Sequence, residues 1–324
     1  MKIYITRIIP DKGIALLRER GFEVVVNPED RVLSRAELIT ALKADRYDGV
    51  LCLLTDKIDS EVFEAAGPQC KIFANYAVGF DNINLDDAEK HNVVVSNTPG
   101  VLSNAVAEHT FALMFAVARR VAESDRFIRK GSFEGWAPMM LLGNEIMGKT
   151  LGIIGLGAIG SRVGHSAAKG FDMKVIYHDM KRSEMFEQDC GGSFRENVDD
   201  IFKEADFVSM HVPLLPTTQH LVNDARLRMM KKTAYLINTA RGPVVDEAAL
   251  VKVLQEGVIA GAGLDVFEHE PQFAPGLTDL ANVVLTPHTA SATVETRDAM
   301  SELAAKNIIE CLEGRTPPTQ VVKK

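Results

Sequence analysis

The chain has 324 residues, of which 46% are hydrophobic and 25% charged, and a formal net charge of −8 at pH 7. This length exceeds the size at which one hydrophobic core usually keeps growing, so we expect two domains. The acidic balance argues against nucleic acid as a partner, because phosphate binding requires a basic face. No apolar stretch suits a signal peptide or membrane span, which predicts a cytoplasmic protein without membrane contact.

The first hundred residues alternate between short apolar runs and helical patterns. The helical patterns include residues 34–43 and 59–65. Alternation of this length predicts a parallel sheet covered by helices on both faces, in a unit that ends near Asn97. The apolar runs that predict its strands cover residues 2–6, 22–26, 48–54, 71–76 and 93–95.

A second α/β unit follows a long, largely apolar segment at 104–129, which we interpret as one interdomain helix and an oligomer contact. After Pro287 the sequence turns helical again over 292–312. No further strands follow, so we expect this helix to pack on the first unit, which gives domains of 1–98 plus 291–324 and of 99–290. The second unit begins at Thr150, and its later strands are predicted at 174–178, 206–210, 234–238, 260–264 and 283–285.

The glycine motif after the run at Thr150 is the strongest local signal. Gly155-Leu156-Gly157-Ala158-Ile159-Gly160 is a GxGxxG sequence between a predicted strand and a predicted helix. Gly155 permits a tight turn, Gly157 lets the backbone approach a pyrophosphate, and Gly160 lets the helix pack close to the strand. The motif predicts a dinucleotide site at a helix N-terminus, although the same sequence also occurs in loops without nucleotide.

Asp179 closes the next apolar run, about 20 residues on, where a carboxylate meets the ribose hydroxyls of NAD. The same carboxylate would repel a 2′-phosphate, so we expect NAD as the cofactor. Lys181 and Arg182 follow closely and keep NADP as the alternative.

Arg241, Glu270 and His288 each follow a predicted strand of the second unit. Ligands of open parallel sheets bind outside the carboxyl ends of the strands, so we expect these residues to share one crevice with a nicotinamide. Reduction of a 2-oxo acid needs a cation for the carboxylate and carbonyl, a proton donor, and a carboxylate that keeps the donor protonated. Arginine, histidine and glutamate provide these functions in turn. Taken singly, each residue could instead be a surface charge or a packing residue.

Six motifs occur in order along the chain: NYAVGFDNI at 75–83, GLGAIG at 155–160, HVPL at 211–214 with Thr217 and Thr218, NTARG at 238–242, GLDVFE at 263–268 and TPH at 286–288. On these motifs the chain resembles the D-isomer-specific 2-hydroxyacid dehydrogenase family over nearly its whole length. The resemblance implies two doubly wound parallel-sheet domains, a flavodoxin-like substrate domain around a Rossmann NAD-binding domain. It also implies that Arg241 binds the 2-oxo acid, that Glu270 orients His288, and that His288 is the acid/base.

Substrate and cofactor contacts follow from the same resemblance. The backbone N–H groups of Ala77-Val78-Gly79 are expected to hold the substrate carboxylate. Leu53 and Trp136 lie in segments most similar to the glyoxylate/hydroxypyruvate reductase branch, and we expect both at the substrate, with a subunit contact as the alternative for Trp136. The further cofactor contacts implied are Val212, Pro213, Thr218, Thr239, Ala240 and Asp265, beside Gly155, Gly157, Ala158, Ile159, Gly160 and Asp179.

We therefore expect NAD(P)H-dependent reduction of glyoxylate or hydroxypyruvate to the D-2-hydroxy acid by a homodimer. Dehydrogenases of 3-phosphoglycerate, D-lactate or phosphite are alternatives from the same family, and a nucleotide-sensing module similar to the corepressors with this fold is a less favoured one. Neither the scattered cysteines nor the histidines have metal-ligand spacing, which predicts no metal site and reduced thiols. The histidines assigned to packing or surface positions are His91, His109 and His165, and His178, next to Asp179, is expected to face the adenosine side or solvent.

Overall fold

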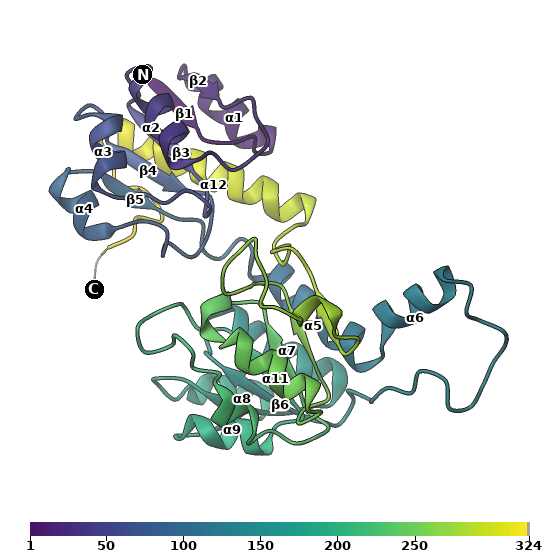
Figure 1. Cartoon of the computed structure of the whole chain (residues 1–324). Helices are drawn as coiled ribbons and strands as arrows, with labels where there is room; N and C mark the ends of the chain where they lie inside the picture. The colour runs from purple at the N-terminus through teal and green to yellow at the C-terminus, as the bar shows by residue number, and fades with distance from the viewer. Residues whose placement is uncertain (323–324) are drawn as a thin grey trace. The chain divides into compact units, whose positions relative to one another are not determined.

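The computed structural model describes residues 1–322 (Figure 1). The chain divides into two compact units. Unit 1 contains Met1–Leu102 and the chain from Ala292 on, and unit 2 contains Ser103–Ser291. None of the helices in the described part of the chain has the length and apolar character that a membrane span requires.

Unit 1 is built on a five-stranded parallel sheet with the strand order β2-β1-β3-β4-β5. This is the flavodoxin-like order, which confirms the predicted fold class. The strands are β1 (Lys2–Ile5), β2 (Glu23–Val26), β3 (Gly49–Cys52), β4 (Ile72–Asn75) and β5 (Val94–Ser96). The helices are α1 (Asp11–Glu19), α2 (Arg35–Lys43), α3 (Ser60–Ala66), α4 (Leu85–Lys90) and α12 (Val294–Leu312).

The last helix of the chain belongs to unit 1. In Figure 1, α12 (yellow) lies with the purple and blue strands of this unit, and it packs on α1, β3 and β4. Its contact with α1 is so close that a Cβ atom on Gly13 would lie 2.2 Å from the Ser301 carbonyl oxygen. The Ser301 hydroxyl accepts a hydrogen bond from the Gly13 N–H at 3.0 Å. Glycine at position 13 therefore permits the close approach of the two helices.

Unit 2 contains a seven-stranded parallel sheet with the order β12-β11-β10-β9-β6-β7-β8. Counted within the unit, this is the doubly wound Rossmann order with one more strand at the edge. The strands are β6 (Thr150–Ile154), β7 (Lys174–His178), β8 (Ser193–Phe194), β9 (Phe207–Met210), β10 (Tyr235–Asn238), β11 (Gly261–Leu264) and β12 (Val283–Leu285). The helices are α5 (Ser103–Ala118), α6 (Val121–Arg129), α7 (Ala158–Phe171), α8 (Glu184–Cys190), α9 (Val198–Glu204), α10 (Asp224–Leu227) and α11 (Glu247–Gln255), with 3-10 turns η1 (Gly242–Val244) and η2 (Leu277–Asp279).

Both faces of this sheet are buried, which explains the nearly continuous apolar runs of its strands. Ile153 of β6 belongs to a core that includes Leu113 of α5 and Val163 of α7. The next residue, Ile154, belongs to the core on the opposite face, with Leu250 of α11.

The segment 104–129 differs from the single helix expected. It forms α5 and α6, because Arg120 between them takes a left-handed backbone conformation with φ of 53°. The Arg120 guanidinium pairs with Glu123 at 2.7 Å, and the Asn144 N–H binds the Ala118 carbonyl at the end of α5 at 2.8 Å. In Figure 1, α6 and the chain after it extend away from the body of unit 2, and the chain returns to that body at Asn144 and the buried Ile146.

Candidate active site

The glycine loop joins β6 to α7 in unit 2. Gly155 has φ of +95°, and a Cβ atom there would lie 2.7 Å from the His211 carbonyl group. On Gly160 a Cβ atom would lie 2.1 Å from the Gly155 carbonyl oxygen. Gly157 is the N-cap of α7, and a Cβ atom there would meet nothing within 4 Å. The first and third glycines are thus required by packing, whereas the second leaves open space at the helix N-terminus, beside Ala158 and Ile159, which fits an approaching pyrophosphate.

Asp179 follows β7 and lies against the same loop. Its Oδ2 atom accepts a hydrogen bond from the Leu156 N–H at 2.6 Å. A carboxylate at this point fits hydrogen bonding to a ribose diol. Arg182, one of the two cations that kept NADP open, pairs with Glu187 of its own unit at 2.7 Å.

The carboxyl ends of the parallel strands of unit 2 place most of the predicted residues along one edge of the sheet. Val212 and Pro213 follow β9, and Thr239 and Ala240 follow β10. The Thr218 hydroxyl donates to the Pro213 carbonyl at 2.6 Å, which closes the turn after β9. The Rossmann topology thereby lines up segments that lie far apart in the sequence.

Glu270 and His288 form a hydrogen-bonded pair. His288 Nδ1 lies 3.0 Å from Glu270 Oε2, and Glu270 Oε1 accepts from the Phe267 N–H at 3.0 Å. Burial acts to raise the pKa of Glu270, but the contact with His288, the Phe267 N–H and the charge of Arg241 outweigh it and lower that pKa. Glu270 is therefore ionised at neutral pH and places its negative charge beside the His288 imidazole.

Arg241 follows β10, and its backbone is held by Asn238. The buried Asn238 amide donates to the Arg241 carbonyl at 2.9 Å and accepts from the Ala240 N–H at 3.0 Å. A Cβ atom on Gly242 would lie 1.8 Å from the Phe267 carbonyl oxygen. This close backbone approach brings the Arg241 segment against the segment that carries Glu270, in agreement with the influence of the Arg241 charge on Glu270.

A further network anchors the segment that carries Glu270. His220 Nε2 lies 2.6 Å from Glu268 Oε1, and Glu268 Oε2 accepts from the Glu247 N–H at 3.2 Å. The Glu247 carboxylate in turn accepts from the Ala274 N–H at 2.7 Å. The segment 268–274, which carries Glu270, is therefore fixed to unit 2 at its first residue by His220 and Glu247 and at its last residue by Glu247.

Asp265 is fully buried after β11 and holds the loop that carries His288. Its carboxylate accepts from the Thr286 hydroxyl at 2.6 Å and from the N–H groups of Thr289 and Ala290 at 2.7 and 2.8 Å. Burial acts to raise the pKa of Asp265, but the hydrogen bonds outweigh it and lower that pKa. His288 itself has φ of +54°, so these contacts stabilise a backbone conformation that is unfavourable for a non-glycine residue.

His109 joins this network, although the sequence assigns it to packing or surface. Its Nε2 atom lies 2.9 Å from Thr286 Oγ1 and 3.3 Å from Asp265 Oδ1. Thr110, the next residue of α5, lies 3.1 Å from the Thr239 hydroxyl. No local motif marks these residues, because their partners lie 177 and 129 positions away in the sequence.

The predicted substrate loop of unit 1 is fixed by its carbonyl groups. The carbonyls of Ala77-Val78-Gly79 accept from the Thr98 N–H, the Asn97 amide and the Asn75 amide, each at 2.8 Å. Within residues 1–322 no acceptor binds the N–H groups of these three residues. Leu53 lies after β3, where the Asn82 amide donates to its carbonyl at 3.0 Å. A loop with its carbonyls tied back and its N–H groups available fits a carboxylate ligand.

Trp136 lies in the segment between α6 and β6, and 83% of its surface is exposed. It therefore belongs to none of the hydrophobic cores of the two units.

Comparison with known proteins identifies the family. The sequence model of the D-isomer specific 2-hydroxyacid dehydrogenase NAD-binding domain matches residues 111–290. A glyoxylate reductase of Pyrococcus furiosus is 47% identical, with 100% of this chain and 96% of that protein covered. A crystal structure of a Thermus thermophilus protein has a TM-score of 0.92 and 42% identity, covering 99% of this chain and 100% of that chain.

A further comparison concerns the cofactor. The crystal structure of an NADPH-dependent glyoxylate/hydroxypyruvate reductase from Sinorhizobium meliloti, in complex with NADP and malonate, has a TM-score of 0.85 and 31% identity. It covers 99% of this chain and 96% of that chain. The chain therefore belongs to the D-isomer specific 2-hydroxyacid dehydrogenase family of NAD(P)-dependent oxidoreductases.

Proposed function

We propose that the protein reduces a small 2-oxo acid, glyoxylate or hydroxypyruvate, to the D-2-hydroxy acid with NAD(P)H. The observation that carries this proposal is the pairing of His288 Nδ1 with Glu270 Oε2 at 3.0 Å, beside the Arg241 segment. The 47% identical relative named glyoxylate reductase supports the choice of substrate.

The division of the chain into two units suggests that each unit binds one of the two reactants. We propose that residues 1–98 with 291–324 bind the substrate and that residues 99–290 bind the dinucleotide. Gly155, Gly157, Ala158, Ile159 and Gly160 would hold the pyrophosphate, and Asp179 the adenosine ribose. Val212, Pro213, Thr218, Thr239, Ala240 and Asp265 would complete the cofactor contacts. The bound nicotinamide supplies the hydride.

His288 then acts as the proton donor. Because Nδ1 is bound to Glu270, the Nε2 atom remains to donate a proton to the carbonyl oxygen of the substrate as negative charge develops there. The lowered pKa of Glu270 keeps this carboxylate ionised, so its negative charge lies against His288 Nδ1. Asp265 positions the His288 loop through the N–H groups of Thr289 and Ala290.

Arg241 binds the substrate and polarises its carbonyl group. A guanidinium presents a planar pair of donors that matches a carboxylate. The N–H groups of Ala77-Val78-Gly79 would hold the substrate carboxylate without adding charge. Leu53 and Trp136 are proposed as further substrate contacts.

NAD is the cofactor that Asp179 favours. A 2′-phosphate would meet its carboxylate, and like-charge contact costs several kcal/mol. The ratio of kcat/KM with NADH to kcat/KM with NADPH tests this assignment, and a ratio at or below one contradicts it.

We further propose that the protein is a homodimer. Helix α6 has no buried residue, and Phe133, Trp136 and Met139 are exposed on the segment that extends from it. Exposed apolar side chains gathered on one segment mark a contact surface. Light scattering should give twice the 35.5 kDa chain mass, and a Phe133→Lys variant should shift the mass toward one chain.

The direct test of the reaction is NADH oxidation with a panel of 2-oxo acids. Turnover with glyoxylate or hydroxypyruvate above pyruvate and 3-phosphohydroxypyruvate supports the proposal. Tight NADH binding without turnover of any 2-oxo acid would instead indicate a nucleotide-sensing protein.

A further inference from the structure

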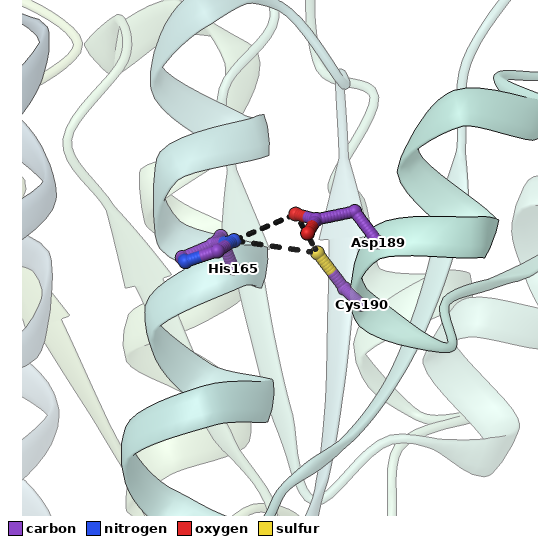
Figure 2. A group of neighbouring side chains, drawn as sticks. All are labelled: His165, Asp189 and Cys190. Atoms are coloured by element: carbon purple, nitrogen blue, oxygen red, sulfur yellow. Dashed lines mark hydrogen bonds and ion pairs between the residues drawn. The ribbon is translucent and has the colours of Figure 1, made fainter.

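Three metal-ligating side chains meet on the surface of unit 2, apart from the residues proposed for catalysis. Figure 2 shows His165 on α7 facing Asp189 and Cys190 at the end of α8. His165 Nδ1 lies 2.7 Å from Asp189 Oδ2, and Cys190 Sγ lies 3.2 Å from the same oxygen and 3.9 Å from His165 Nδ1. Within residues 1–322 this is the one group of three such ligands.

The two helices that carry these side chains are fixed against each other. Phe186 of α8 is buried, and a Cβ atom on Gly164 of α7 would lie 2.4 Å from its ring. Its ring also meets Tyr177 edge to face, with the centroids 5.4 Å apart. Gly191 ends α8 in the left-handed conformation with φ of +68°, directly after Cys190. The contact of α7 with α8 therefore holds the imidazole opposite the carboxylate and the thiol before any ligand arrives.

The ligand types and spacing suit zinc. An imidazole nitrogen, a carboxylate oxygen and a thiolate sulfur are the donors that Zn²⁺ binds in proteins, at bond lengths that give ligand separations of about 3.3–3.8 Å in a tetrahedron. The observed separations of 2.7, 3.2 and 3.9 Å surround this range, so small side-chain rotations suffice. The exposed position of His165 and Asp189 leaves room for water to complete the coordination.

The alternative role for this cysteine is that of a reactive thiolate. In this structure the Cys190 thiol is partly buried and donates a hydrogen bond to Asp189 Oδ2 at 3.2 Å, a contact that a shared metal ion would replace. A coordinated Zn²⁺ deprotonates its thiol ligand, with the proton released to solvent.

We propose that His165, Asp189 and Cys190 form a surface binding site for Zn²⁺ that links α7 to α8. The spacing rules applied to the sequence miss it, because the ligands come from two helices and His165 lies 24 positions before Asp189. The site does not depend on the proposed reaction, since none of its residues takes part in hydride or proton transfer.

Cobalt substitution tests the proposal on the full-length protein after treatment with a chelator. Titration with Co²⁺ should produce the near-ultraviolet charge-transfer band of a cobalt–thiolate bond, with one ion per chain, and Zn²⁺ should abolish the band. Competition with a chromophoric chelator should then give the Zn²⁺ affinity. Cys190→Ser should abolish the band, and His165→Ala should weaken Zn²⁺ binding at least tenfold.

Cys311 provides the matched control, because it is a partly buried thiol on α12 that belongs to no such ligand group in the described chain. Cys311→Ser should leave the cobalt band and the Zn²⁺ affinity unchanged. Circular dichroism establishes that each variant is folded. A wild-type protein without the cobalt band, or a band that persists in Cys190→Ser, overturns the proposal.

Discussion

The glycine loop permits a prediction that separates folding from cofactor binding. In Gly160→Ala the new Cβ atom would lie 2.1 Å from the Gly155 carbonyl oxygen, a backbone atom that cannot rotate away. Relief requires a movement of α7 by roughly 1 Å, and such overpacking costs about 1–3 kcal/mol. We therefore expect the free energy of unfolding to fall by about 1–3 kcal/mol.

Gly157→Ala is the matched variant. Its φ of −75° suits any residue, and the new methyl group would meet nothing within 4 Å. The lower entropy of the unfolded chain and the poorer N-cap offset each other, so the free energy of unfolding should change by less than about 1 kcal/mol. The methyl group would, however, occupy the space proposed for the pyrophosphate, and we expect the Kd for NADH to rise at least tenfold.

Urea unfolding measures the free energy of unfolding, and NADH fluorescence titration measures the Kd for NADH. The two variants should give different patterns: Gly160→Ala should lose stability, whereas Gly157→Ala should lose NADH affinity at nearly unchanged stability. If Gly157→Ala binds NADH as tightly as the wild type, the pyrophosphate does not approach this part of the loop.

Three further variants test the roles proposed for Arg241, Glu270 and Asp265. Arg241→Lys should raise KM for the 2-oxo acid and lower kcat at unchanged NADH affinity, because a lysine lacks the planar pair of donors; loss of NADH binding alone would contradict this. Glu270→Gln should move the alkaline limb of the reduction profile to lower pH, because removal of the charge destabilises the protonated His288; an unmoved limb would show the pair to be structural. Since the pKa of Glu270 is lowered, the stability that its charge contributes should be lost only as the pH falls through that low value. Asp265→Asn should lower kcat and destabilise the protein by about 1–3 kcal/mol, because an amide nitrogen cannot accept from the loop N–H groups, and unchanged kcat would refute the positioning of His288 by this loop.

Much of the fold follows from local patterns in the sequence. The apolar runs predict nearly all strands, because strands of a parallel sheet are buried on both faces. Strand β8 is missed because it has only two residues, Ser193 and Phe194. The break at Arg120 is also missed, because neither glycine nor proline marks it and the left-handed conformation depends on contacts with Glu123 and the segment near Asn144.

Some residues of the candidate site can be predicted from the sequence, and others cannot. Arg241, Glu270 and His288 can be proposed from their positions after strands, because parallel topology brings strand ends to one edge. His109 cannot, since its role arises from packing of α5 beside a loop 177 residues later. The group of His165, Asp189 and Cys190 cannot be predicted from the sequence for the same reason. Its side chains lie on two helices that pack together through the buried Phe186.

The most direct test of the proposed reaction is the turnover of His288→Ala at saturating NADH and hydroxypyruvate, with NADH binding measured by fluorescence on the same sample. The wild type should oxidise NADH and release D-glycerate. The variant should bind NADH normally and lose at least about a hundredfold in kcat at every pH, because no group remains to protonate the developing alkoxide. Near-normal turnover in His288→Ala would contradict the assignment of His288 as the proton donor and with it the proposed mechanism.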